Sequence, residues 1–82
     1  MLTYKLVHEA KDGNPALYLV LWGSEKIGLL EKYPNTKTET HPWKAYIGVG
    51  QAAEFIGSHY GKDGRSKACR AIQERHFGYA AV

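Results

Sequence analysis

The side chains best suited to chemistry in this sequence are one cysteine and four histidines. Cys69 would act as a nucleophile if a histidine lay close enough to accept its proton. His76 follows it by seven residues on the same expected helix, which separates the two by about 10 Å along the axis. That distance is too long for a hydrogen bond. The better interpretation of Cys69 is a small buried residue.

Metal ligands and acid–base pairs are also missing from the pattern. The four histidines are scattered along the chain, and none has the spacing of a metal-binding motif: His8, His41, His59 and His76. The carboxylates form no pair that argues for general acid–base catalysis. We therefore expect a protein that is not an enzyme and that uses no metal and no cofactor.

Two glycine-rich stretches partly match nucleotide-binding motifs. Residues Gly48–Ala53 have the glycine spacing of the dinucleotide fingerprint, but Gly57 interrupts the long helix that must follow. Residues Gly57–Asp63 approximate a P-loop, but three residues separate the glycines where the motif needs four, and Asp63 replaces the required Ser or Thr. Neither stretch predicts a nucleotide site.

Positive charge is concentrated near the C-terminal end. The chain carries a net charge of +3. All of it comes from residues 59–82, which contain five basic and two acidic side chains. With the backbone amides of residues 61–64, these cations could hold a phosphate of a nucleic acid. We predict a basic edge that contacts phosphate or an acidic protein surface, formed by Lys62, Arg65, Lys67 and Arg70. The alternative is a solvated helix face.

A second candidate surface is aromatic. The chain contains ten Phe, Trp and Tyr residues. In Ala16–Trp22 the side chains alternate between two apolar faces, so Tyr18 and Trp22 lie opposite the leucines of this segment. If the leucines pack under the helix, Tyr18 and Trp22 lie on the far face.

Lys44 and Tyr46 share one face of a later strand and complete this candidate aromatic surface. An exposed patch that contains Trp and Tyr marks a binding or dimer surface. The alternative is that residues 77–82 or the polar loop of residues 34–42 fold over the rings.

A sheet and one helix are needed to position these side chains. Apolar patterns predict strands at Leu2–Glu9, Ala16–Trp22, Ile27–Tyr33 and Trp43–Ile47, with a fifth element of uncertain type at Ala52–Ile56. A glycine-rich loop is expected at residues 57–64.

The last expected element is a helix over about Ser66–Phe77. Asp63 or Ser66 would cap its start, and Gly78 fits the position just past its end. Arg70 and Glu74 are four residues apart and could pair. The prediction is a single α+β domain over residues 1–82: an antiparallel sheet of four to five strands with one C-terminal helix packed on one face.

The apolar runs and the N-terminal residues bear on where in the cell the protein is expected. The longest apolar run is Ala16–Trp22, seven residues, whereas a membrane span needs about 20. The N-terminus lacks the apolar run and cleavage site of a signal peptide. With a single cysteine and no export signal, we expect a cytoplasmic protein without a membrane partner.

One segment resembles a known family. Trp43-Lys44-Ala45-Tyr46, a glycine-containing turn and the helix of Ser66–His76 resemble the sheet-plus-helix pattern of arm-type DNA-binding domains of phage integrases, over residues 27–77. The resemblance implies DNA contact through the sheet face, with Lys44 and Tyr46 at the matching positions. Few basic residues lie on the strands, which departs from that family.

In size and composition the chain is also similar to small phage accessory proteins. These include anti-CRISPR inhibitors, which mostly dock on host protein complexes. We therefore expect a non-enzymatic binding protein, of phage accessory inhibitor type, that docks on a protein or nucleoprotein complex handling nucleic acid. The alternative is a domain that binds DNA or RNA directly through the basic segment and the sheet aromatics. The chain could act as a monomer or a homodimer.

Overall fold

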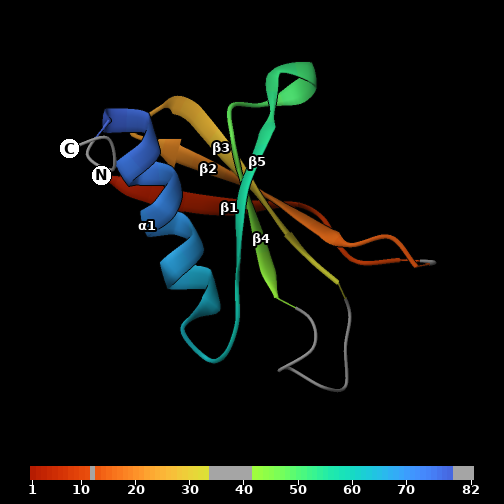
Figure 1. The fold of residues 1–82 in the computed structure, drawn as a ribbon. Coiled ribbons are helices and arrows are strands. Elements are labelled where there is room, and N and C mark those ends of the chain that lie inside the picture. The colour runs from red at the N-terminus through yellow and green to blue at the C-terminus, as the bar shows by residue number, and fades with distance from the viewer. Residues whose placement is uncertain (12, 34–41, 79–82) are drawn as a thin grey trace.

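The computed structural model describes residues 1–11, 13–33 and 42–78 as one antiparallel sheet and one helix (Figure 1). The elements are β1 (Leu2–His8), β2 (Ala16–Trp22), β3 (Glu25–Lys32), β4 (Trp43–Ile47), a short 3₁₀ helix η1 (Gly50–Ala52), β5 (Glu54–His59) and α1 (Gly64–Phe77). The strands lie in the order β1-β2-β3-β4-β5, so each pairs with its neighbour in the sequence. The predicted α+β fold is confirmed.

The predicted boundaries are close to the observed ones except after β4. β2 and β4 have the predicted bounds, and the element of uncertain type is η1 followed by β5. The expected loop over residues 57–64 is partly wrong, because β5 continues to His59 and α1 already begins at Gly64. Gly57 stays in the strand, with a φ of +156°, where the register of β4 and β5 shifts. Most of the polar loop and residues 79–82 lie outside the described residues.

Small residues decide which face of the sheet the helix covers. A Cβ added to Gly28 would lie 2.6 Å from Ile72 Cγ2, so α1 approaches the sheet as closely as glycine permits. Val20 pairs with Gly28 in the sheet, and Leu30 pairs with Ala45. Partner residues share a face, and Val20, Leu30, Ala45 and Ile72 are all fully buried in the core.

This packing reverses the expected orientation of β2. Val20 faces α1, so its alternating neighbours Tyr18 and Trp22 face the same way, and both pack against the core. The leucines that were expected under the helix lie on the opposite face: Leu17, Leu19 and Leu21. The arrangement with these leucines under the helix is wrong because α1 packs on the opposite face, where Gly28 and Ala45 leave room for it beside Val20 and Leu30.

The helix begins and ends near its predicted limits. Asp63 is the N-cap residue, although its side chain makes no capping hydrogen bond. Gly78 adopts the left-handed conformation, with a φ of +78°, and donates its N–H to carbonyls of the last turn, as a C-terminal glycine commonly does. Arg70 and Glu74 do not form the expected ion pair. Instead, Arg75 and His76 approach Glu54 and Glu25, each at 3.8 Å.

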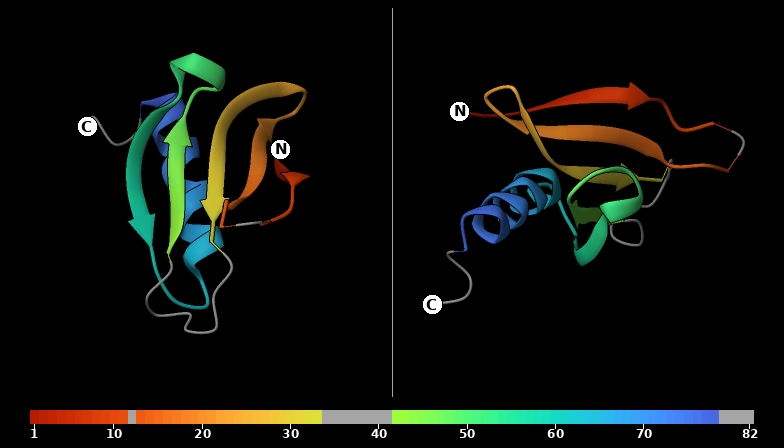
Figure 2. Two further views of the ribbon diagram at one scale, coloured as in Figure 1. Left: turned by 90° about the vertical axis from the view of Figure 1, so that its right-hand side faces the viewer. Right: turned by 90° about the horizontal axis from the view of Figure 1, so that it is seen from above.

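The helix covers one face of the sheet and leaves the other open (Figure 2). α1 packs mainly against β3, β4 and β5. Within the described ranges, no element lies over the opposite face. No described helix has the length and apolar character to cross a membrane.

Candidate binding surfaces

The residues that could do covalent chemistry are not arranged for it. Cys69 is only 7% exposed, and burial raises the pKa of its thiol, so the reactive thiolate is disfavoured. The ring of His76 lies 3.8 Å from a carboxylate oxygen of Glu25. Among the residues that the structure describes, no three His, Cys, Asp or Glu side chains gather where they could hold a metal ion.

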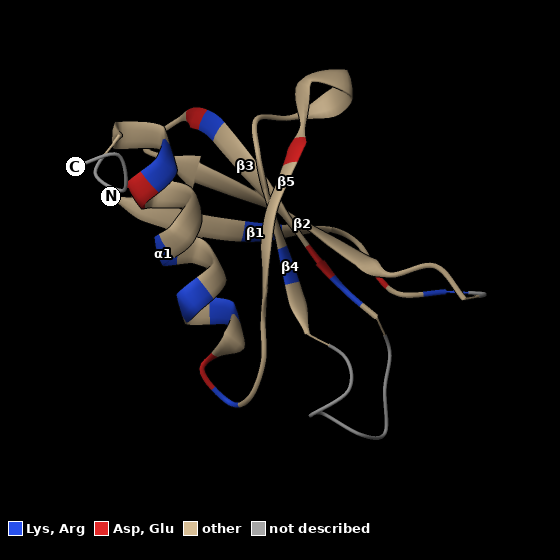
Figure 3. Ribbon diagram, in the orientation of Figure 1, with Lys and Arg blue, Asp and Glu red and all other residues tan. Residues whose placement is uncertain are grey.

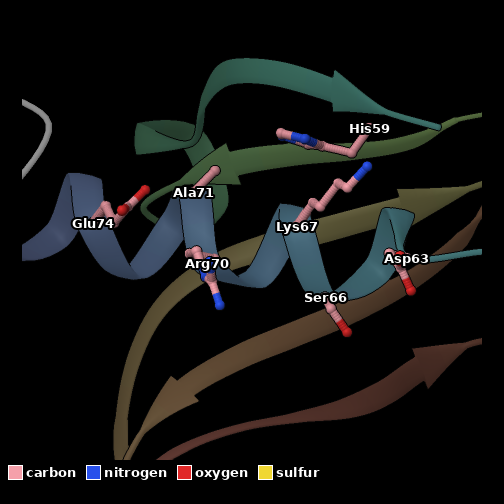
Figure 4. A pocket seen from close by; sticks show the side chains of 7 residues that line it. All are labelled: His59, Asp63, Ser66, Lys67, Arg70, Ala71 and Glu74. Carbon is pink, nitrogen blue, oxygen red and sulfur yellow. The ribbon is translucent and has the colours of Figure 1, made fainter. Parts of the chain in front are cut away.

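The four cations of the predicted basic edge are all exposed and lie in the loop before α1 and along its first half (Figure 3). They do not share one direction. Lys67 points towards β5 and His59, whereas Arg70 points the opposite way (Figure 4). Arg65 reaches β1, where its guanidinium carbon lies 4.6 Å from the centre of the Tyr4 ring. The basic residues therefore divide between two sides of the helix.

On the β5 side, the helix borders a pocket of mixed charge. The pocket has a volume of about 530 Å³, and its lining includes Lys67 and Arg70 together with Asp63 and Glu74. Two carboxylates thus offset two cations. The Nε2 atom of His59, which also lines the pocket, is buried and has no hydrogen-bond partner in the structure.

On the β1 side, the helix borders a groove that carries only positive charge. This β1–α1 groove has a volume of about 300 Å³ and is lined by Leu2, Thr3, Tyr4, Arg65, Ser66, Cys69, Arg70 and Gln73. Two arginines face it and no carboxylate does. Hydroxyl and amide groups supply the remaining polar lining, so the groove suits an anionic group.

The predicted aromatic surface is divided between the two faces of the sheet. Tyr18 lies between Tyr4 and Trp43, with ring centres 5.9 and 5.3 Å away. Trp22 packs on Phe77 at 5.0 Å. Both rings lie on the helix side and support the core.

Lys44 and Tyr46 lie on the opposite face, as their pairing with Glu31 and Leu29 on β3 shows. Tyr18, Trp22, Lys44 and Tyr46 therefore do not form one surface. What sequence reasoning missed on this side is the run of half-buried leucines between the strands. The alternation of residues 16–22 places these leucines on one face of β2, but it does not show which face the helix covers.

We call this side of the sheet the uncovered face and define it by Leu17, Leu19, Leu21, Leu29, Tyr46 and Phe55. Leu19 pairs with Leu29, and Tyr46 pairs with Phe55. The Tyr46 and Phe55 rings meet edge to face at 5.5 Å. Phe55 is 51% exposed, more than any of the other five residues.

Two polar side chains on the uncovered face, Tyr46 and Lys44, contact neighbouring groups. The Tyr46 hydroxyl donates a 2.7 Å hydrogen bond to Oε1 of Glu31. Burial, and then this hydrogen bond to Glu31, raise the pKa of Tyr46 to about 12. The ammonium of Lys44 lies 5.3 Å from the centre of the Tyr33 ring. The uncovered face therefore carries the carboxylate of Glu31 beside Tyr46 together with the lysines Lys5 and Lys44.

Comparison with protein-family models, with curated proteins and with solved structures finds no match.

Proposed function

We propose that the protein is a non-catalytic binding protein that docks on another protein through the uncovered face. The observation that carries the proposal is the row of half-buried leucines between the strands, which no described element covers. An apolar patch of this kind on a small domain is typical of an interaction site. The partner we propose is a protein or nucleoprotein complex that handles nucleic acid.

Phe55 and Tyr46 are the anchors in this proposal. Aromatic residues at the centre of an interface commonly carry most of the binding energy. Phe55 is half exposed, so it loses much solvent contact when a partner covers it. Tyr46 is held by Glu31 and by the Phe55 ring, which leaves it little freedom to lose on binding.

Direct binding of DNA or RNA is the second candidate, and the four exposed cations near the start of α1 favour it. Their different directions weaken it. The discriminating measurement is a titration of labelled duplex and single-stranded DNA at low and moderate salt. Affinity that falls steeply with salt would indicate phosphate contacts and would favour this candidate.

The test of the main proposal compares Phe55→Ala with Tyr60→Ala in affinity capture from a host lysate. Tyr60 is a matched control, because it is 52% exposed against 51% for Phe55 but lies beyond the end of β5. Proteins captured by the unmodified chain and by Tyr60→Ala, but lost with Phe55→Ala, would support docking through the uncovered face. An unchanged set with Phe55→Ala would contradict it. The sedimentation coefficients of the unmodified chain and of the two variants show whether the protein forms a homodimer.

A further inference from the structure

The two edges of the sheet differ in how well they are protected. β5 is interrupted by the register shift opposite Ala45 and Tyr46 and by the left-handed Gly57, and it packs against α1. β1 pairs regularly with β2 over the five residues from Leu2 to Leu6 and has its own register shift only beyond them, between Leu6 and His8. No described residue pairs with its outer side. Exposed edges that are long and regular can accept an additional strand.

The backbone groups that point outward from β1 can be identified. Gly23 donates its N–H to the carbonyl of Met1 at 3.0 Å, so Met1 and Gly23 form a hydrogen-bonded pair. Such pairs alternate along antiparallel strands. The backbone of Lys5 therefore bonds to β2, whereas Tyr4 and Leu6 direct their N–H and C=O groups to the outer edge.

The side chains along this edge are apolar and basic. Leu6 and Val7 are 43% and 52% exposed, and β1 contains no acidic residue. Its single lysine, Lys5, pairs with Leu19 and so lies on the uncovered face. On the helix side, Arg65 lies over the Tyr4 ring and Arg70 lines the same β1–α1 groove. A strand added beside β1 would meet positive charge on both of its faces.

We propose that the outer edge of β1 binds an extended acidic segment of a partner protein as a sixth strand. Backbone hydrogen bonds would form at Tyr4 and Leu6, and alternate acidic side chains would reach Arg65 and Arg70 in the β1–α1 groove. Charge decides the occupant. A second copy related by a two-fold axis would place the same cations against each other, and a nucleic acid cannot continue the backbone ladder.

The site lies at a different edge from Phe55 and does not depend on the uncovered face. The probe is a synthetic peptide of alternating glutamate and valine, about eight residues long. The controls are a lysine–valine peptide of the same length and single-stranded oligo-dT. Binding is followed by chemical shifts and by amide hydrogen exchange.

We expect the glutamate peptide to bind and to slow exchange at the Tyr4 and Leu6 amides by about tenfold. The Lys5 amide, already bonded to β2, should hardly change. Arg65→Gln with Arg70→Gln should weaken binding by about fivefold, whereas Lys67→Gln, on the β5 side, should not. Phe55→Ala should bind the peptide normally, which separates this site from the proposed docking face.

A backbone variant tests the hydrogen bonds themselves. Leu6→Pro removes an outward donor, which an edge strand tolerates, and should abolish the protection at Tyr4, whereas Leu6→Ala should retain it. The proposal is overturned if the glutamate peptide does not bind, or if it binds without protecting Tyr4 and Leu6. Equal binding of the lysine peptide, oligo-dT binding at Arg65 in its place, or β1-to-β1 self-association would also overturn it.

Discussion

Gly28, where β3 comes close to α1, allows a test of which face of the sheet the helix covers. A methyl group there would lie 2.5 Å from the carbonyl oxygen of Tyr46 and 2.6 Å from Ile72 Cγ2. Overpacking of this kind costs about 1–3 kcal/mol. Gly28 does not have a positive φ, so alanine fits its backbone conformation. Without the overlap, alanine would stabilise the protein by about 0.4–1 kcal/mol, because it reduces the conformational entropy of the unfolded chain.

We therefore expect Gly28→Ala to lower the free energy of unfolding by about 1.3 kcal/mol, the difference between the midpoints of these two ranges. In a domain of this size that lowers Tm by about 5–10 °C. Urea unfolding followed by circular dichroism measures the change. Ile72→Ala removes the contacting Cγ2 atom, so in that background Gly28→Ala should cost about 1 kcal/mol less.

Leu29 and Leu30 provide a matched pair for the same argument. They are adjacent on β3 and point to opposite faces, and Leu30 is fully buried beneath the helix. Leu30→Ala should cost about 2–5 kcal/mol, and Leu29→Ala roughly half as much, because its side chain is only half-buried. If Gly28→Ala were neutral, or if Leu29→Ala cost more than Leu30→Ala, the placement of α1 would be refuted.

Three further predictions concern individual groups. Cys69 should react slowly with a thiol reagent at neutral pH and fast in denaturant, because burial raises its pKa; fast labelling of the folded protein would contradict this. Tyr46 should be the last tyrosine to ionise in an absorbance titration, with Glu31→Gln lowering its pKa from about 12. Its contribution to stability should be complete below about pH 10 and lost as the pH rises towards 12. Gly64→Ala should destabilise the fold by about 1–3 kcal/mol in urea unfolding, because the new methyl would lie 2.8 Å from Trp43 Cδ1; unchanged stability would show that the helix start can shift.

The elements could be predicted from the sequence because each has a local cause. The apolar run of β2, the alternation of β4 and the glycine after Phe77 each act within a few residues. The orientation of β2 could not, because both of its faces are apolar. The deciding residue, Gly28, lies on another strand and acts through its lack of a side chain.

The arrangement of the basic edge could be predicted from the sequence only in part. Its four residues are close in sequence, and the structure places them together near the start of α1. Their divergence follows from helix geometry, since Arg65 and Lys67 are two positions apart and cannot face the same side. This divergence could be predicted from the sequence. The contact of Arg65 with Tyr4 on β1 was not, because it joins the two ends of the described chain.

The order of the strands has a consequence for folding kinetics. Every strand pairs with its sequence neighbour, and the helix packs mainly on β3, β4 and β5, which come just before it in the chain. Such local connectivity lowers the entropy lost before contacts form, and proteins with it fold fast for their sheet content. Each strand of a ribosome-bound chain can therefore pair with the strand before it as it emerges, and the helix, which emerges last, then covers the sheet.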